Sequence, residues 1–122
     1  MKLSARMLSR LGPNGCFGLA MNELASVYDN LAVFTADLQN FSGLDRFAEL
    51  NQDKMFDVGI AEQNLIGAAA GYASEGNIVY ASTYASFASM RDLDQVSVNM
   101  AYMKLNVKLI GLNYIFFWQF LS

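Results

Sequence analysis

The chain contains no histidine, a single cysteine and few charged residues. Without histidine it cannot by itself supply a histidine-activated nucleophile, an imidazole metal ligand or an imidazole proton shuttle. Because Cys16 is the only cysteine, an internal disulfide and a thiolate metal cluster are also excluded. Charged residues make up 16% of the 122 residues, below the roughly 25% of an ordinary domain. With 54% hydrophobic residues, the composition excludes a disordered chain and indicates a surface partly covered by another protein.

Positive charge and long apolar runs are scarce as well. Eight Lys and Arg against eleven Asp and Glu give a net charge of −3, with no basic run, which argues against a nucleic-acid partner. No apolar run of the kind found in secretory signals follows the first basic residues. The most apolar stretch, 109–121, is too short for a membrane-spanning helix and is interrupted by Asn113 and Gln119. We therefore expect a cytoplasmic protein without a membrane segment, and a free thiol fits that compartment.

The order of apolar and polar segments predicts strands alternating with helices in about one domain. Helices are predicted at 17–28, 44–50, 61–75 and 86–103, and strands at 31–36, 55–60, 78–82 and 106–112. The run 31–36 is continuously apolar, which is typical of a strand buried on both faces of a parallel sheet. Gly76 is placed to end the third helix. The pattern predicts an α/β fold with three layers, α/β/α, and a mainly parallel sheet.

Glu62 is the first candidate for chemistry. It follows a predicted strand, in the first turn of a helix made of small residues, at an edge where open α/β sheets bind ligands. The helix dipole would stabilise a negative charge there. The alternative is a first-turn glutamate that only complements the dipole.

Two further places follow predicted strands. Asp37 either faces a ligand or serves as a turn or N-cap residue after the strand at 31–36. Tyr84 and Phe87, three residues apart, either stack on a flat ligand or pack in the core. The pattern alone leaves both alternatives open.

The residues around Glu62 resemble the pyrimidine-binding domain of transketolases, and more narrowly the C-terminal subunit of a split bacterial transketolase. The segment reads Val-Gly-Ile-Ala before Glu62 and Gln-Asn after it. The resemblance covers roughly residues 3–112 and includes the segments 9–12, 17–20, 35–38, 42–47, 82–84, 90–91 and 105–109. The ordered set of segments is far more specific than any single one.

This resemblance implies a thiamine diphosphate enzyme that moves a two-carbon ketol unit between sugar phosphates, as in pentose phosphate metabolism. Glu62 would be catalytic: it would bond the aminopyrimidine ring and favour the imino tautomer, whose nitrogen takes the proton of the thiazolium carbon. Asp37 would lie close to the cofactor at a dimer interface. Tyr84 and Phe87 would line the aminopyrimidine pocket, and Gln63 would belong to the same wall.

The resemblance also implies partners. No motif for a diphosphate or a metal stands in this chain, so a diphosphate-binding N-terminal transketolase subunit would hold the cofactor's diphosphate and its magnesium, in a homo- or hetero-oligomer. Alternatives are a related reaction, that of a deoxyxylulose-phosphate synthase or a 2-oxoacid dehydrogenase beta subunit, or a non-catalytic remnant. Alone, the chain would be inactive.

The last ten residues depart from the family pattern. Relatives continue with a glycine-rich segment that contains histidine, whereas residues 113–122 are uncharged and rich in aromatics. We expect a partial pyrimidine-binding domain at 1–112, incomplete at its C-terminus. The segment 113–122 would be an aberrant tail that a shifted reading frame or a truncated gene explains.

Overall fold

The computed structural model describes residues 4–112, so the predicted tail at 113–122 lies outside the described residues. Its centre is a sheet of four parallel strands in the order β2-β1-β3-β4. The strands are β1 (Leu31–Thr35), β2 (Met55–Asp57), β3 (Ile78–Tyr84) and β4 (Val107–Leu112). In the register, Val33 of β1 lies opposite Met55 of β2 and Tyr80 of β3. Since all four strands run the same way, their carboxyl ends meet at one edge, and the predicted parallel sheet is confirmed.

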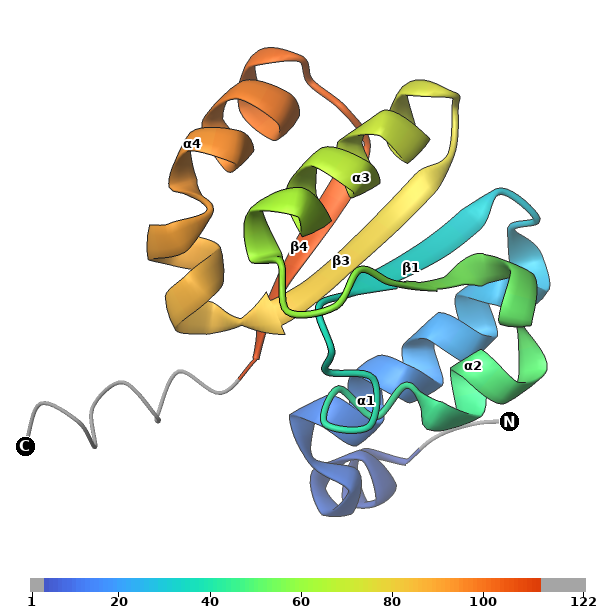
Figure 1. Cartoon of the computed structure of the whole chain (residues 1–122). Helices are drawn as coiled ribbons and strands as arrows, with labels where there is room; N and C mark the ends of the chain where they lie inside the picture. The colour runs from blue at the N-terminus through green and yellow to red at the C-terminus, as the bar shows by residue number, and fades with distance from the viewer. Residues whose placement is uncertain (1–3, 113–122) are drawn as a thin grey trace, which may run out of the picture.

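Helices cover both faces of this sheet (Figure 1). α1 (Ala5–Val27) and α2 (Asp45–Leu50) lie on one face, and α3 (Glu62–Ser74) and the helical segment 87–102 lie on the other. Each face has its own core: Met21 and Phe47 belong to one, Leu65 and Ala69 to the other. The predicted three-layer α/β/α fold is therefore confirmed.

Strand β1 divides its side chains between the two cores. Leu31 and Val33 pack toward α1 and α2, whereas Ala32 and Phe34 pack toward α3. All five residues of β1 are buried, as the continuous apolar run predicts. A strand buried on both sides fixes the position of its carboxyl end, where Asp37 follows.

Two predicted elements are shortened or broken in the structure. The strand predicted at 55–60 ends at Asp57, because Gly59 takes a φ of 76° that leaves the extended conformation. The helix predicted at 86–103 is broken at Asp92, whose N–H donates to the carbonyl of Phe87 in a wide, π-type turn. Short helix α4 (Leu93–Gln95) and a second wide segment, Val96–Tyr102, follow the break.

The first helix is longer than the prediction of 17–28. It begins at Ala5, with a kink at Gly12 directly before Pro13. The other predicted elements shift by at most two residues, and Gly76 has the positive φ of a helix-ending glycine. Among residues 4–112, no helix is both long and apolar enough to span a bilayer.

Helix α1 packs directly on the loop that follows Asp37. A Cβ atom added to Gly18 would overlap the carbonyl oxygen of Gly43. Gly43 itself has a φ of 72° and lies against the backbone of Asn14. The absence of side chains at both glycines therefore lets the helix support the loop after β1.

We predict that Gly18→Ala lowers the free energy of unfolding by about 3 kcal/mol or more, because the backbone of Gly43 cannot yield as a flexible side chain would. Gly67→Ala is the matched control. Gly67 lies in α3 with open space around it, and there alanine should stabilise the helix by up to about 1 kcal/mol. Urea unfolding of the two variants measures the difference; equal stabilities would contradict this packing.

Candidate functional site

A cavity opens where the carboxyl ends of β1 and β3 meet the start of α3. Its volume is about 140 Å³. It is lined by Ala36, Asp37, Leu38, Ile60, Glu62, Tyr84 and Phe87. Four of the five predicted site residues, Asp37, Glu62, Tyr84 and Phe87, thus come together from three separate segments. The fifth, Gln63, lines an adjoining hollow of about 400 Å³, and Glu62 lines both.

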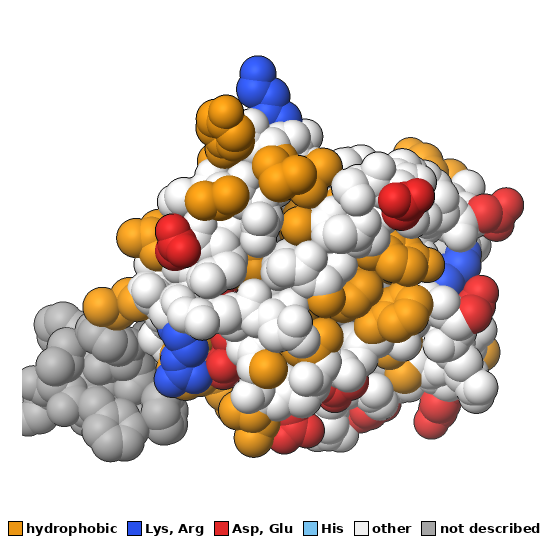
Figure 2. Space-filling model, turned by 45° about the horizontal axis from the view of Figure 1, so that its top comes forward, with side chains coloured by type: hydrophobic (Ala, Val, Ile, Leu, Met, Phe, Trp, Pro, Cys, Tyr) orange, Lys and Arg blue, Asp and Glu red, His pale blue; other side chains and the backbone are white. Residues whose placement is uncertain are grey.

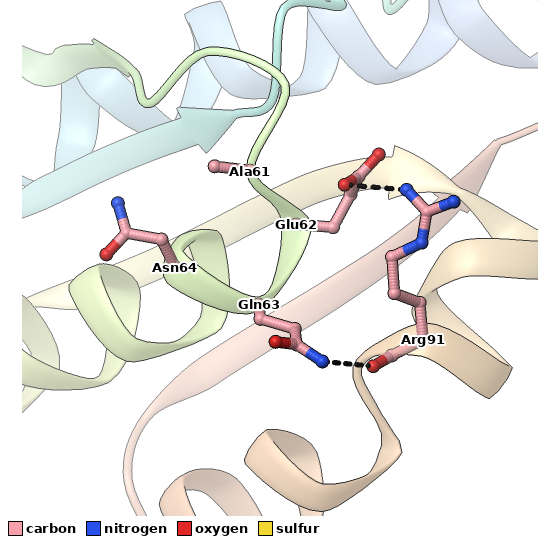
Figure 3. Close-up of a pocket in the computed structure, with 5 residues that line it drawn as sticks. All are labelled: Ala61, Glu62, Gln63, Asn64 and Arg91. Atoms are coloured by element: carbon pink, nitrogen blue, oxygen red, sulfur yellow. Dashed lines mark hydrogen bonds and ion pairs between the residues drawn. The ribbon is translucent and has the colours of Figure 1, made fainter.

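Glu62 is the first residue of α3 and is 6% exposed. Its Oε2 atom lies 3.0 Å from Nη1 of Arg91, in an ion pair that Figure 3 shows at the edge of the hollow. A buried carboxylate is costly unless a charged or hydrogen-bonding partner compensates for the lost water. Arg91, whose side chain is 48% exposed, supplies that partner from the boundary with solvent.

Arg91 also contacts two other predicted site residues. Its backbone carbonyl accepts a hydrogen bond of 3.1 Å from Nε2 of Gln63 (Figure 3). Its guanidinium carbon lies 3.8 Å from the centre of the Phe87 ring, in cation–π geometry. Arg91 was not among the residues predicted for the site. The sequence does contain one indication of its importance, because Arg91 and Asp92 are the only charged residues between Glu75 and Asp94.

Aromatic rings form one wall of the cavity. Tyr84 is the last residue of β3 and Phe87 begins the wide turn after it, with ring centres 5.8 Å apart and planes nearly perpendicular. Phe41, which the sequence analysis also missed, lies 5.1 Å from the ring of Tyr84. Tyr84 and Phe87 are half-buried and border the cavity, so they differ from ordinary core aromatics.

Asp37 is exposed and has a φ of 57°, the left-handed conformation that aspartate tolerates better than most residues. Its N–H donates to Oδ1 of Asp57 at 2.8 Å, and the same oxygen accepts the N–H of Gly59 at 2.9 Å. Asp57 therefore connects the end of β1 to the turn that leads into Glu62. Asp57 lies inside the strand predicted at 55–60, and its place two residues before Gly59 was the only signal in the sequence.

Asp92 directly follows Arg91 in the chain and is fully buried. Within the described residues, neither of its carboxylate oxygens has a hydrogen-bond partner. Burial raises the pKa of Asp92, the charge of Glu62 raises it further, and Arg91 partly opposes both. Asp92 was likewise not a predicted site residue.

The chemistry of this site suits a flat, nitrogen-containing ring. Buried Glu62 can exchange a hydrogen bond or a proton with a ring nitrogen, and the aromatic wall can stack on the ring. Asp37 adds a second carboxylate at the rim. In the part of the chain that the structure describes, no group of three or more histidine, cysteine, aspartate or glutamate side chains could hold a metal ion.

Comparison with known families gives one match that covers most of the chain. The model of the transketolase pyrimidine-binding domain matches residues 14–114. This range contains every residue of the cavity described above.

Individual relatives agree with that match. A protein of Methanocaldococcus jannaschii described as a transketolase C-terminal section is 43% identical over 95 residues, which are 78% of this chain and 30% of the relative. The 6-deoxy-6-sulfo-D-fructose transketolase subunit SqwH of a Clostridium species is 42% identical over 89 residues, 73% of this chain and 28% of that subunit.

A solved structure, of a split-gene transketolase as an inactive beta4 tetramer, superimposes with a TM-score of 0.75 at 37% identity. The match covers 81% of this chain and 33% of the solved one. The chain thus spans about a third or less of the length of these relatives.

We predict that Asp57→Ala lowers the free energy of unfolding by about 1–3 kcal/mol, because two backbone N–H groups lose a charged acceptor. Asp57→Asn keeps an acceptor oxygen at the same place, so its free energy of unfolding should fall by less than half as much as that of Asp57→Ala. Thermal or urea unfolding of both variants measures this ranking. Equal losses for the alanine and asparagine variants would show that the shared acceptor does not hold the two turns.

Proposed function

Because the chain belongs to the transketolase family, as a pyrimidine-binding domain, we propose that it supplies the pyrimidine-binding half of a thiamine diphosphate-dependent transketolase. The observation that carries the proposal is the cavity in which Glu62, Asp37, Tyr84 and Phe87 meet at the carboxyl edge of the sheet. In this proposal the domain occupies residues 1–112, the segment 113–122 departs from the family pattern, and the protein acts in the cytoplasm.

The side chains that line the cavity fit the pyrimidine end of the cofactor. Tyr84 and Phe87 would contact the face of the ring, and Glu62 would bond a ring nitrogen. Asp37 would lie at the open side, and Gln63 would keep the start of α3 attached to the segment that carries Phe87. The cavity is polar on the side of the carboxylates and apolar on the side of the rings, as an aminopyrimidine requires.

When bound, thiamine diphosphate would supply a thiazolium carbon that becomes a nucleophile toward the carbonyl of a ketose phosphate once its proton has been removed. The residues of this chain would act on the ring that controls the removal of that proton. Glu62 would hold a proton at the ring nitrogen, and its burial would keep water from competing for that proton. Arg91 orients the Glu62 carboxylate from one side, since Phe87 and Gln63 fix the arginine in turn.

The reaction would need a second subunit. We place the diphosphate and its magnesium on a diphosphate-binding N-terminal transketolase subunit, in a homo- or hetero-oligomer that includes a dimer. Large apolar side chains stay exposed near the site: Ile60 is 78%, Met90 67% and Leu93 58% exposed. Figure 2 shows apolar side chains among scattered charges on the face it presents, which supports a covered surface.

The substrates would be sugar phosphates, between which a two-carbon ketol unit moves, as in pentose phosphate metabolism. The named relatives are transketolase sections or subunits, and one is named for a sulfo-sugar. This supports ketol transfer over the reactions of deoxyxylulose-phosphate synthases and 2-oxoacid dehydrogenases. A phosphate and a sulfonate are both anionic ends, so either sugar class agrees with the proposal.

We predict that the chain alone binds thiamine diphosphate and magnesium no more tightly than about millimolar. Stacking contributes about 0.5–1.5 kcal/mol beyond burial and one hydrogen bond about 1 kcal/mol, against several kcal/mol for lost motional freedom. Calorimetric titration measures this, with the same titration in the presence of the diphosphate-binding subunit as the comparison. Micromolar one-to-one binding by the chain alone would refute the proposal that it supplies only half of the cofactor site.

In the reconstituted complex, we predict that Glu62→Gln slows hydrogen–deuterium exchange at the thiazolium carbon by at least about 100-fold. The amide has the same size and still forms hydrogen bonds, but it cannot share a proton with the ring nitrogen. Glu75→Gln, at the exposed other end of the same helix, is the control and should leave the exchange rate unchanged. Equal rates in the two variants would remove Glu62 from the proposed role.

A further inference from the structure

Asp92 is a buried acid without an evident structural reason. Its backbone is satisfied: the N–H donates to the carbonyl of Phe87 and the carbonyl accepts from the N–H of Val96. Its side chain precedes α4 but makes no N-capping hydrogen bond, which is the usual reason for an aspartate at that place. Both carboxylate oxygens are buried and, among residues 4–112, unpartnered. A group left in this state costs stability, so its presence requires an explanation.

Asp92 directly follows Arg91 in the chain, and the helical segments on both sides of it pack against α3, which begins at Glu62. The groups whose charge acts on its carboxyl are Glu62, from α3, and Arg91, from its own segment. Of the strands that pack nearby, β3 brings the phenol of Tyr84. Strand β4 carries Lys108, which is directed to Asn106 and to the ring of Tyr80. The local set is therefore two buried carboxylates and one guanidinium.

That guanidinium lies against Glu62 in the structure. Arg91 is held by its ion pair with Glu62 at 3.0 Å, by the ring of Phe87 at 3.8 Å and by the bond from Gln63 to its carbonyl. Two carboxylates near one cation compete for its electrostatic field, and the negative charge of each disfavours the ionised form of the other. An arginine acting on Glu62 alone would hold it as an ionised, acceptor-only group.

We propose that Asp92 is a positioning residue that tunes Glu62: its buried negative charge offsets part of the field of Arg91, so that Glu62 can take up the proton it shares with a ring nitrogen. The inference rests on the proposed function for its purpose, but the coupling that it invokes between the two acids requires no ligand. It explains why an unpartnered acid stands beside an ion pair that would otherwise be complete.

The test is the titration of Glu62 in the cofactor-free full-length chain. The chain has four glutamates, so labelling their side-chain carboxyl carbon with carbon-13 gives four signals, and Glu62→Gln assigns the one that matters. In Asp92→Asn we expect the Glu62 signal to titrate about half a pH unit or more lower than in the parent, because a nearby negative charge is gone. Asp94→Asn, an exposed acid two residues away, is the control and should leave it unmoved.

A second readout follows the pH dependence of stability. Since burial raises the pKa of Asp92, its unfavourable ionisation sets in as pH rises through that raised value. Asp92→Asn should therefore gain thermal stability relative to the parent between pH 4 and pH 8, and Asp94→Asn should not. If the asparagine variant fails to fold, Asp92→Ala removes the same charge and should displace the Glu62 signal in the same direction.

An unmoved Glu62 signal in a folded Asp92 variant, or an equal displacement in Asp94→Asn, would overturn the inference. Its failure is distinguishable from failure of the proposed function, because the titration needs no cofactor. A displaced signal in a chain that never binds thiamine diphosphate with its partner would support the coupling and refute the transketolase role. Binding of thiamine diphosphate together with an unmoved Glu62 signal would support the transketolase role and refute the coupling.

Discussion

The ion pair between Glu62 and Arg91 is the interaction on which the site depends. It stabilises a carboxylate that is 6% exposed at the start of a helix. It also joins α3 to the segment after β3, which carries the aromatic wall. Removing the arginine would leave a buried, uncompensated charge, which is more costly than replacing the pair as a whole. One contact thus affects both the environment of Glu62 and the packing of α3 against the segment after β3.

The fold brings the members of this site together through the parallel sheet. Because β1, β2 and β3 run in one direction, Asp37, Asp57 and Tyr84 arrive at the same edge from distant parts of the sequence. The shared acceptor at Asp57 and the close approach of α1 to the loop after Asp37 hold that edge. The apolar strands place the site residues at one edge of the sheet, and the few charged residues there provide the chemistry.

Much of this was predictable from the sequence. Apolar runs such as 31–36 predict buried strands, and Glu62, Asp37, Tyr84 and Phe87 were selected because each follows such a run. Arg91, Asp57 and Asp92 were not selected, since their roles arise from contacts between residues 20 or more apart in the chain or from burial. The break at Asp92 was missed for the same reason: the residues on both sides favour a helix, and only the tertiary structure shows the wide turn there.

The most direct test of the account is a crystal structure of this chain in complex with a diphosphate-binding transketolase subunit and thiamine diphosphate. The account predicts the aminopyrimidine ring in the cavity between Asp37 and Phe87. A carboxylate oxygen of Glu62 should lie about 2.6–3.2 Å from a ring nitrogen, and the diphosphate and metal should lie wholly on the other subunit. A ring bound elsewhere, or a Glu62 that contacts Arg91 alone, would contradict it.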